Sequence, residues 1–169
     1  MQDDSTREIP LTRGKVAIID AADYERVSGY KWHACRPSKL NIWYARSHVG
    51  KRPSRRFIHL HRIILDAPDG LQVDHVDGDG LNCRRSNMRV ATRSQNQANK
   101  GKYRNNTSGF KGVCLAQGRW IAQIGHNRKV VYIGSYDTAE EAARAYDARA
   151  IELFGEFAGI NFPRGEYTL

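Results

Sequence analysis

The sequence predicts an α+β chain built from two small domains. Short segments rich in β-branched and aromatic residues lie within residues 15–60, and a polar segment dense in Asp and Asn follows at residues 71–100. Three further strand-like segments and one amphipathic helix come after residue 109. The length of 169 residues suits one domain or two small ones.

Strands and short helical turns are expected in the N-terminal part. Residues 15–20 and 42–49 are β-branched, apolar or aromatic, which is typical of strands. Residues 21–30 can form a short helix that begins near Asp20. Residues 56–60 predict another strand, and residues 61–65 continue as a helical turn before the turn signal at residues 66–70.

A three-stranded antiparallel sheet packed on one helix is expected in the C-terminal part. Residues 110–116, 119–126 and 130–136 predict strands, because Gln117-Gly118 and residues 127–129 stand where hairpin turns belong. Thr138 and Glu141 have the spacing of a capping box, and the helix that they start runs to about Phe154. Alanines recur on one face of this helix, so it can lie close to the sheet.

The charge pattern favours a polyanionic partner. The net charge is +9, with eight Lys and Arg but no acid in residues 36–62, and seven but no acid in residues 99–131. Five aspartates lie between these stretches, in residues 66–79. Basic stretches on both sides of an acidic cluster suit a polyanion held around a site that needs carboxylates. Charge alone does not separate DNA from RNA or from an anionic membrane surface.

Other classes of protein are disfavoured. The three cysteines, Cys35, Cys83 and Cys114, are far apart and form no C-x-x-C pair, which argues against a disulfide scaffold and a cysteine-based zinc site. No apolar run approaches the ~20 residues that cross a bilayer. Residues 1–4 are polar and acidic, so no secretory signal is expected. We expect a cytoplasmic protein with no membrane partner.

Residues 73–96 carry the candidate chemistry, and they read VDHVDGDGLNCRRSNMRVATRSQN. This segment resembles the HNH nuclease motif, in which Asp-His ends a strand, a Gly- and Asn-rich loop follows, and Asn-(Leu/Met)-Arg begins a second strand. A helix then carries a third His or Asn. His75, Asn87 and Asn96 match the three positions, and the resemblance covers residues 57–100. It is strongest to the small HNH enzymes of phages and mobile introns.

The resemblance implies a role for each residue. His75 would be the general base, because imidazole titrates near neutral pH and can take a proton from water. Asp74 and Asn96 would hold a divalent metal through oxygen, which favours Mg²⁺, with Mn²⁺ as the alternative. In the family the middle Asn orients the loop and the base, and Asn87 would take that role. Because Asn96 is a neutral ligand where some relatives have His, modest metal affinity is expected.

This region has two alternative interpretations, a calcium loop and a metal site that includes histidines. A twelve-residue calcium loop needs Glu at its last position, where this chain has Arg85 or Met88. His59 and His61 lie two residues apart on a predicted strand, so they share a face and could touch metal, phosphate or the core. A structural or phosphate role is favoured. The pair His61-Arg62 matches relatives, and we expect it to contact DNA together with the motif residues Arg84 and Arg85.

Residues 108–163 resemble the AP2 DNA-binding domain, through residues 110–113 (FKGV), 119–124 (RWIAQI) and 132–137 (YIGSYD). The resemblance implies a three-stranded sheet in the major groove with the helix behind it. Cys114 and Ala116 stand where plant members place base-reading arginines, so the plant target sequence does not transfer. Trp120 can equally be a core residue. DNA contacts are expected from Lys111, Arg119, Trp120, Arg128, Lys129 and Tyr132.

The sequence therefore predicts a two-module, metal-dependent DNA endonuclease of the homing type. Residues 1–100 would form the HNH domain, with a ββα-metal core at about 71–100, followed by a linker at 101–107 and an AP2-like domain at 108–169. The expected partner is double-stranded DNA, with no small-molecule cofactor beyond the metal. A monomer or weak dimer is expected; a monomer has one site and would nick one strand, whereas double-strand cleavage would need two copies. The resemblance to phage enzymes implies a bacterial or phage-infected host cell, where the protein would act on DNA. The alternatives are a non-catalytic DNA-binding transcriptional regulator and a nuclease that acts on structured RNA.

Overall fold

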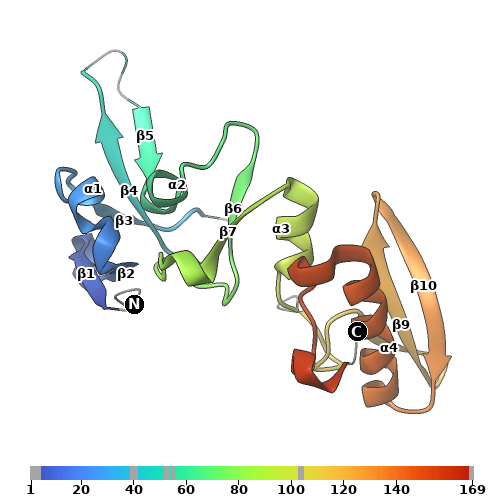
Figure 1. The fold of residues 1–169 in the computed structure, drawn as a ribbon. Coiled ribbons are helices and arrows are strands. Elements are labelled where there is room, and N and C mark those ends of the chain that lie inside the picture. The colour runs from blue at the N-terminus through green and yellow to red at the C-terminus, as the bar shows by residue number, and fades with distance from the viewer. Residues whose placement is uncertain (1–4, 39–41, 52–53, 55, 103–104, 168–169) are drawn as a thin grey trace. The chain divides into compact units, whose positions relative to one another are not determined.

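The structure is a computed structural model that describes residues 5–38, 42–51, 54, 56–102 and 105–167. It divides into two compact units, Met1–Arg93 and Ser94–Leu169, each with its own hydrophobic core (Figure 1). The N-terminal residues 1–4, on which the expectation of no secretory signal depends, lie outside the described residues, as do residues 103–104 of the predicted linker. None of the described helices is long and apolar enough to cross a membrane.

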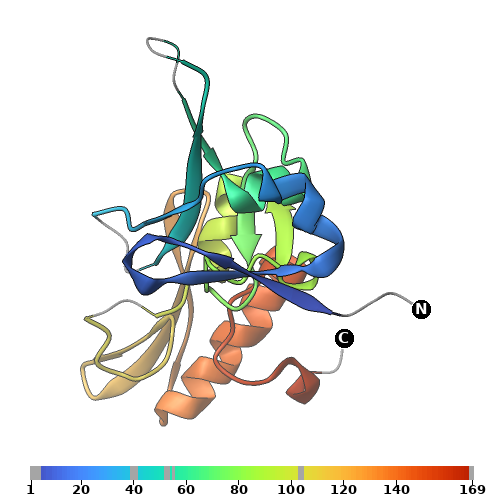
Figure 2. The same ribbon diagram turned by 90° about the vertical axis from the view of Figure 1, so that its left-hand side faces the viewer.

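The first unit combines small antiparallel sheets with two short helices. Strand β1 pairs with β2, β4 lies between β3 and β5, and β6 pairs with β7. The β4–β5 hairpin projects from this unit (Figures 1 and 2). The elements are β1 (Thr6–Pro10), β2 (Val16–Asp20), α1 (Tyr24–Ser28), β3 (His33–Cys35), β4 (Tyr44–Val49), β5 (Arg56–His59), α2 (Leu60–Leu65), β6 (Gln72–His75) and β7 (Met88–Ala91).

One core joins these small elements. Ile19 of β2, Val27 of α1 and Leu60 of α2 are fully buried in the same cluster. The loop between β6 and β7 is attached to this core, because the Ile18 amide donates to the Leu81 carbonyl at 2.9 Å and the Cys83 amide donates to the Ile18 carbonyl at 2.8 Å. The loop that follows His75 is therefore anchored on strand β2.

The second unit is a three-stranded antiparallel sheet with a helix on one face (Figure 1). Ala122 and Ile124 of the central strand are buried in one cluster with Ala143 and Tyr146 of the helix. A capping box starts that helix, since the Glu141 amide donates to Thr138 and the Thr138 amide to Glu141. The elements are α3 (Arg93–Asn99), β8 (Val113–Ala116), β9 (Arg119–His126), β10 (Lys129–Tyr136) and α4 (Ala139–Phe154).

Most predicted elements are confirmed, with differences at their ends. The expected strand at residues 110–116 begins only at Val113. Gly112 before it has φ +75° and lies so close to the ring of Tyr146 that a Cβ atom would clash at 2.0 Å. A φ of +75° lies outside the extended region, so the strand begins only after Gly112. Strands β1 and β3 were not predicted, and helix α3 groups with the second unit.

Candidate functional site

Strand β6 places Asp74 and His75 at its C-terminal end. Asp74 pairs with Arg89 and His75 with Met88 of strand β7. The chain turns directly afterwards, where the Gly78 amide donates to the His75 carbonyl at 3.0 Å. Both side chains are buried, and burial lowers the pKa of His75 although neighbouring aspartates oppose this shift. At neutral pH His75 is therefore a neutral imidazole, the form that can accept a proton.

Asn87 holds the loop that follows His75. Its Nδ2 donates to Asp77 Oδ1 at 2.9 Å and to the Asn82 carbonyl at 2.8 Å, and its Oδ1 accepts from the Asp77 amide at 3.1 Å. The Asn87 carbonyl also accepts from the Val76 amide at 2.8 Å. Both ends of the Asn87 amide and its backbone therefore bind the turn, which fixes the direction in which the chain leaves His75.

Arg89 forms an ion pair with the predicted metal ligand Asp74. Its Nε and Nη2 lie 2.9 Å and 2.8 Å from Asp74 Oδ2. The side chains of Arg89 and Asp74 are only 16% and 3% exposed, so solvent screens the pair weakly. Sequence reasoning named Asp74 but overlooked Arg89. The signal was present in the spacing, because a β-hairpin that ends at His75 and resumes at Met88 puts residues 74 and 89 opposite each other.

Two further rings surround the imidazole of His75. The ring centroids of His61 and Tyr44 lie 5.2 Å and 6.1 Å from that of His75, and they lie 5.6 Å from each other. His61 is 9% exposed, and burial together with the nearby His75 and His59 holds its pKa well below 6.5. Burial and the charge of Asp74 raise the pKa of Tyr44. His61, predicted to contact DNA, thus lies buried against His75, and Tyr44 was not predicted.

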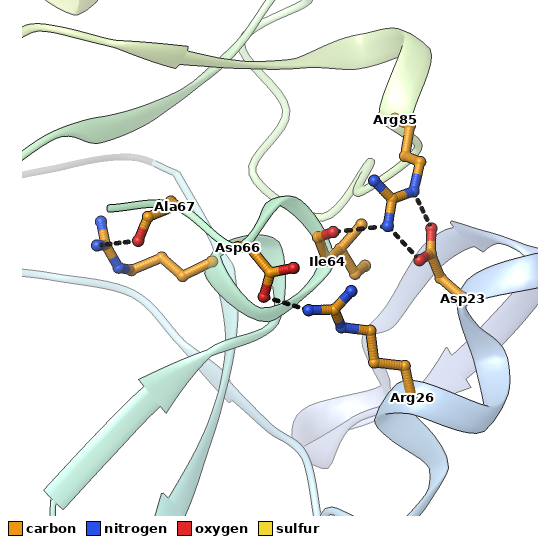
Figure 3. A network of polar contacts seen from close by, with 7 residues as sticks. Asp23, Arg26, Ile64, Asp66, Ala67 and Arg85 are labelled. Carbon is orange, nitrogen blue, oxygen red and sulfur yellow. Dashed lines mark hydrogen bonds and ion pairs between the residues drawn. The ribbon is translucent and has the colours of Figure 1, made fainter. Parts of the chain in front are cut away.

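Arg85, another predicted DNA contact, is bound within the first unit. Its Nε and Nη2 donate to the two carboxylate oxygens of Asp23 at 2.8 Å and 2.7 Å, and Nη2 also donates to the Ile64 carbonyl at 2.7 Å (Figure 3). Arg26 and Asp66 form a second ion pair beside it (Figure 3). Arg85 therefore joins the residue that precedes α1, helix α2 and the segment before β7.

Arg62 and Arg84 have similar internal partners. Arg62 donates to three backbone carbonyls of the turn after α2, those of Leu71 at 2.8 Å, Ala67 at 2.9 Å and Pro68 at 3.0 Å. Arg84 Nε donates to Asp20 at 3.1 Å. Guanidinium groups with such partners stabilise loops, and a DNA contact would have to share or replace these bonds. Their DNA-binding role remains a prediction.

In the second unit, Lys111 points toward helix α3. Its Nζ donates to the Ala98 carbonyl at 2.5 Å, and the Gly159 amide donates to the same carbonyl at 3.0 Å. Burial lowers the pKa of Lys111 to about 8, although Asp147 opposes the shift. Asn96 is half-buried on the same helix. Its predicted pairing with Asp74 remains a prediction.

The remaining predicted DNA contacts differ in exposure. Trp120 packs against the core of the second unit. Arg119 forms an ion pair with Asp137 and lies 3.3 Å from Ser135 Oγ. Arg128, Lys129 and Tyr132 are exposed, at and beside the β9–β10 turn. These three residues are available to an external partner.

The described residues bear on which metal ion the site could hold. Within them, no group of three or more His, Cys, Asp and Glu side chains gathers in a way that could hold an ion. A metal at Asp74 would therefore have few protein ligands, all of them oxygen if Asn96 joins it. That donor set fits Mg²⁺, which keeps several waters and is commonly bound through one or two carboxylates and substrate phosphates.

The sequence matches two family models, one for each part of the chain. The HNH endonuclease model matches residues 66–98, and the AP2 domain model matches residues 108–156. An AP2-like ethylene-responsive transcription factor of Arabidopsis thaliana is 44% identical over 66 residues, which are 38% of this chain and 14% of that protein. The two modules stand in the order that the sequence predicted, and the AP2 domain indicates DNA binding.

Two viral relatives match longer parts of the chain. Protein 3.8 of Escherichia phage T7 is 36% identical over 93 residues, covering 54% of this chain and 76% of that protein. A protein of Acanthamoeba polyphaga mimivirus named as an uncharacterized HNH endonuclease is 35% identical over 150 residues, covering 88% of this chain and 76% of that protein. A relative matched over this much of both chains shows that the chain belongs to the HNH endonuclease family.

Proposed function

We propose that the chain is a metal-dependent DNA endonuclease of the homing type that nicks one strand of a duplex. The observation that carries the proposal is the turn after strand β6. There the neutral imidazole of His75 follows Asp74 at the end of the strand, and Asn87 binds the loop that comes next. A base and an oxygen ligand for a metal are what hydrolysis of a phosphodiester requires.

His75 acts as the general base in this proposal. It takes a proton from the attacking water, and the bonds of Asn87 to the loop keep the imidazole in place. Asp74 and Asn96 hold a divalent ion, Mg²⁺ or alternatively Mn²⁺. Such an ion, when bound, stabilises the negative charge that develops on the phosphate. In this arrangement strands β6 and β7 and helix α3 form the ββα-metal core.

The second unit supplies affinity for double-stranded DNA. Its exposed Arg128 and Lys129 contact phosphates, and Tyr132 lies on the sheet that would enter the major groove. One chain carries one set of site residues, so a monomer cuts one strand, and cleavage of both strands would need two copies. The homing role rests on the resemblance to enzymes of phages and mobile introns.

Incubation with supercoiled plasmid tests this function. We expect conversion to the open-circular form in Mg²⁺ or Mn²⁺ and none in EDTA. Purified His75→Ala protein is the control for a contaminating nuclease, and it should leave the plasmid supercoiled. Full cleavage in EDTA would remove the metal from the proposal, and equal cleavage by the variant would remove His75.

A non-catalytic DNA-binding regulator is the second candidate. The buried ion pair between Arg89 and Asp74 favours it, because Arg89 occupies the carboxylate oxygen Oδ2 that a metal could use. Calorimetric titration with Mn²⁺ separates the two candidates. The nuclease should bind the ion, and Asp74→Asn should weaken that binding. A regulator should bind DNA equally well with and without the ion.

A further inference from the structure

The open face of the β8–β10 sheet carries a defined set of side chains. In antiparallel pairs, directly opposed residues share a face, and here Tyr132 lies opposite Gln123 and Val130 opposite Gly125. Val130 and Tyr132 are 71% and 63% exposed, and Gln123 is also exposed. The alternate residues of β9, Ala122 and Ile124, are buried under α4, so the exposed set lies on the face away from the helix.

Gln123, Val130 and Tyr132 form an uncharged part of this open face, and the β9–β10 turn beside them is basic. No Asp or Glu occurs between residues 80 and 136, so all three strands lack acids. Arg128 and Lys129 stand at the β9–β10 turn, and the charge of Arg119 is balanced by Asp137. The basic turn attracts a polyanion through its phosphates. The amide and the apolar groups of the uncharged part are then left to contact the bases between the phosphate chains of a nucleic acid.

The side chains of this uncharged part match one kind of base pair. A Gln side chain donates and accepts at once, which suits N6 and N7 of adenine, whereas guanine is read best by Arg or Lys. Apolar groups suit the methyl group of thymine. Among the residues that the structure describes, the side-chain amide of Gln123 makes one weak contact, donated from Nε2 to Cys114 Sγ at 3.9 Å, so this amide can turn to a base.

We propose that the open face of this sheet reads A·T base pairs in the major groove. Gln123 pairs with adenine, and Val130 contacts the methyl group of a neighbouring thymine. Gly125, opposite Val130, has open space where a side chain would stand and lets the backbone approach the groove. The inference rests on the proposed DNA binding of the second unit, and it names the class of target that this unit selects.

Binding by the full-length chain in EDTA tests the inference without cleavage. The probes are an A·T-rich and a G·C-rich DNA duplex of equal length, at one fixed salt concentration. We expect tighter binding to the A·T-rich duplex, with Gln123→Ala reducing the preference by about 5- to 150-fold, the range of one good bidentate contact. An RNA duplex of the same sequence should bind weakly, because its major groove is too deep and narrow for a sheet.

A gain of function gives the sharper result. Gln123→Arg should move the preference toward G·C pairs, because Arg is the usual partner of guanine. Gln97→Ala removes the same amide from an exposed position on α3 and should leave the preference unchanged. Arg128→Ala should weaken binding to both duplexes equally.

The outcomes separate this inference from the nuclease proposal. Equal binding to both DNA duplexes, a G·C preference in the wild type, or an unchanged preference in Gln123→Arg would each overturn the inference, as would the absence of binding. None of these results depends on cleavage, which the plasmid assay measures. A chain that prefers A·T pairs through Gln123 but never nicks DNA would keep the inference and contradict the nuclease proposal.

Discussion

At the scale of single residues, arginines of the same charge lie in different surroundings. The guanidinium of Arg85 binds the buried carboxylate of Asp23 and a backbone carbonyl, whereas Arg128 is exposed in a turn. Releasing Arg85 toward a phosphate would leave Asp23, which is 4% exposed, without its partner. An unpaired buried charge is costly, so the main effect of Arg85 is to stabilise the fold.

The first prediction separates these two arginines. Arg85→Ala should lower the free energy of unfolding by about 1–3 kcal/mol, because Asp23 loses its hydrogen bonds. Its DNA affinity should change little while the chain is folded. Arg128→Ala should leave the melting temperature unchanged, lower DNA affinity and reduce the slope of log K against log salt by about one unit. Denaturant unfolding and fluorescence anisotropy measure both quantities.

The second prediction concerns His75 as the proposed general base. His75→Ala should slow cleavage by about 100-fold or more, the usual contribution of general-base catalysis. DNA affinity should be close to wild type, because His75 is buried beside Tyr44 and His61. His33→Ala, on strand β3 of the same unit, is the matched control and should cleave normally. Single-turnover rates at saturating protein make the comparison.

The site was predictable only where the motif is local. His75 and Asn87 stand twelve residues apart within one motif, so the order of residues was enough to propose them. Tyr44 and His61 come from strand β4 and helix α2, and nothing in the local sequence marks their contact with His75. The ion pairs of Arg84 and Arg85 with Asp20 and Asp23 also join distant segments, so the internal partners of this basic pair were not visible in the motif.

At the scale of secondary-structure elements, helix α3 depends on the second unit. It has seven residues, and isolated helices shorter than about 12 residues are marginal in water. The Ala98 carbonyl near its end accepts from the Gly159 amide and from Lys111 Nζ. These partners lie far along the chain, so α3 is stabilised by tertiary contacts rather than by its own sequence.

The third prediction tests this dependence with two fragments. Residues 94–169 contain α3, and residues 108–169 correspond to the predicted AP2-like domain alone. The longer fragment should melt higher, because the shorter one leaves Lys111 and the Gly159 amide without the Ala98 carbonyl. For a domain of this size, each kcal/mol shifts the midpoint by about 4–8 °C. Equal melting temperatures would show that α3 is not bound to the second unit.

The fourth prediction uses the titration of Lys111. Burial lowers its pKa from the ordinary 10.5 to about 8, so at pH values between these the folded chain binds fewer protons than the unfolded chain. Stability contributed by this group therefore rises with pH across that window. Wild type and Lys111→Met should be unfolded with denaturant from pH 7.5 to about 10. The difference in free energy of unfolding should move in favour of wild type as pH rises, and a constant difference would contradict the buried ammonium.

Helices and strands with a local sequence signal were predicted, whereas strands that form through pairing with another strand were not. The capping box of α4 and the alternation in β9 and β10 are local signals, and they gave the right elements. Strand β1 reads TREIP, with three polar residues and a proline, and β3 has only three residues. Each forms because it pairs along one partner, β2 or β4, and such pairing is invisible in a single short segment.

At the scale of the whole molecule, the proposed function assigns chemistry and DNA affinity to different units. Asp74, His75 and Asn87 belong to the first unit, and the acid-free sheet belongs to the second. Helix α3 is the exception, because it carries Asn96 of the motif and is bound by the second unit. In the proposed nuclease, loss of the second unit should lower DNA affinity directly and weaken metal binding through Asn96 of α3.

The fifth prediction compares a deletion with a matched full-length variant. Removing residues 107–169 should weaken DNA binding and flatten its salt dependence, because each lost phosphate contact removes about 0.9 from the slope. Arg128→Ala combined with Lys129→Ala should also flatten the slope, but it leaves Lys111 and α3 intact. Both proteins must first show a cooperative melt and a folded circular dichroism spectrum.

Metal dependence then distinguishes the two proteins. The double variant should nick plasmid at the Mg²⁺ concentration that wild type needs, once its weaker binding is overcome with more protein. The deletion leaves the Ala98 carbonyl without Lys111 and Gly159, so α3 frays and Asn96 is held poorly. Residual nicking should therefore need more Mg²⁺ and show relaxed sequence preference. If the folded deletion keeps the affinity and metal requirement of the full chain, the second unit neither binds the DNA nor supports α3.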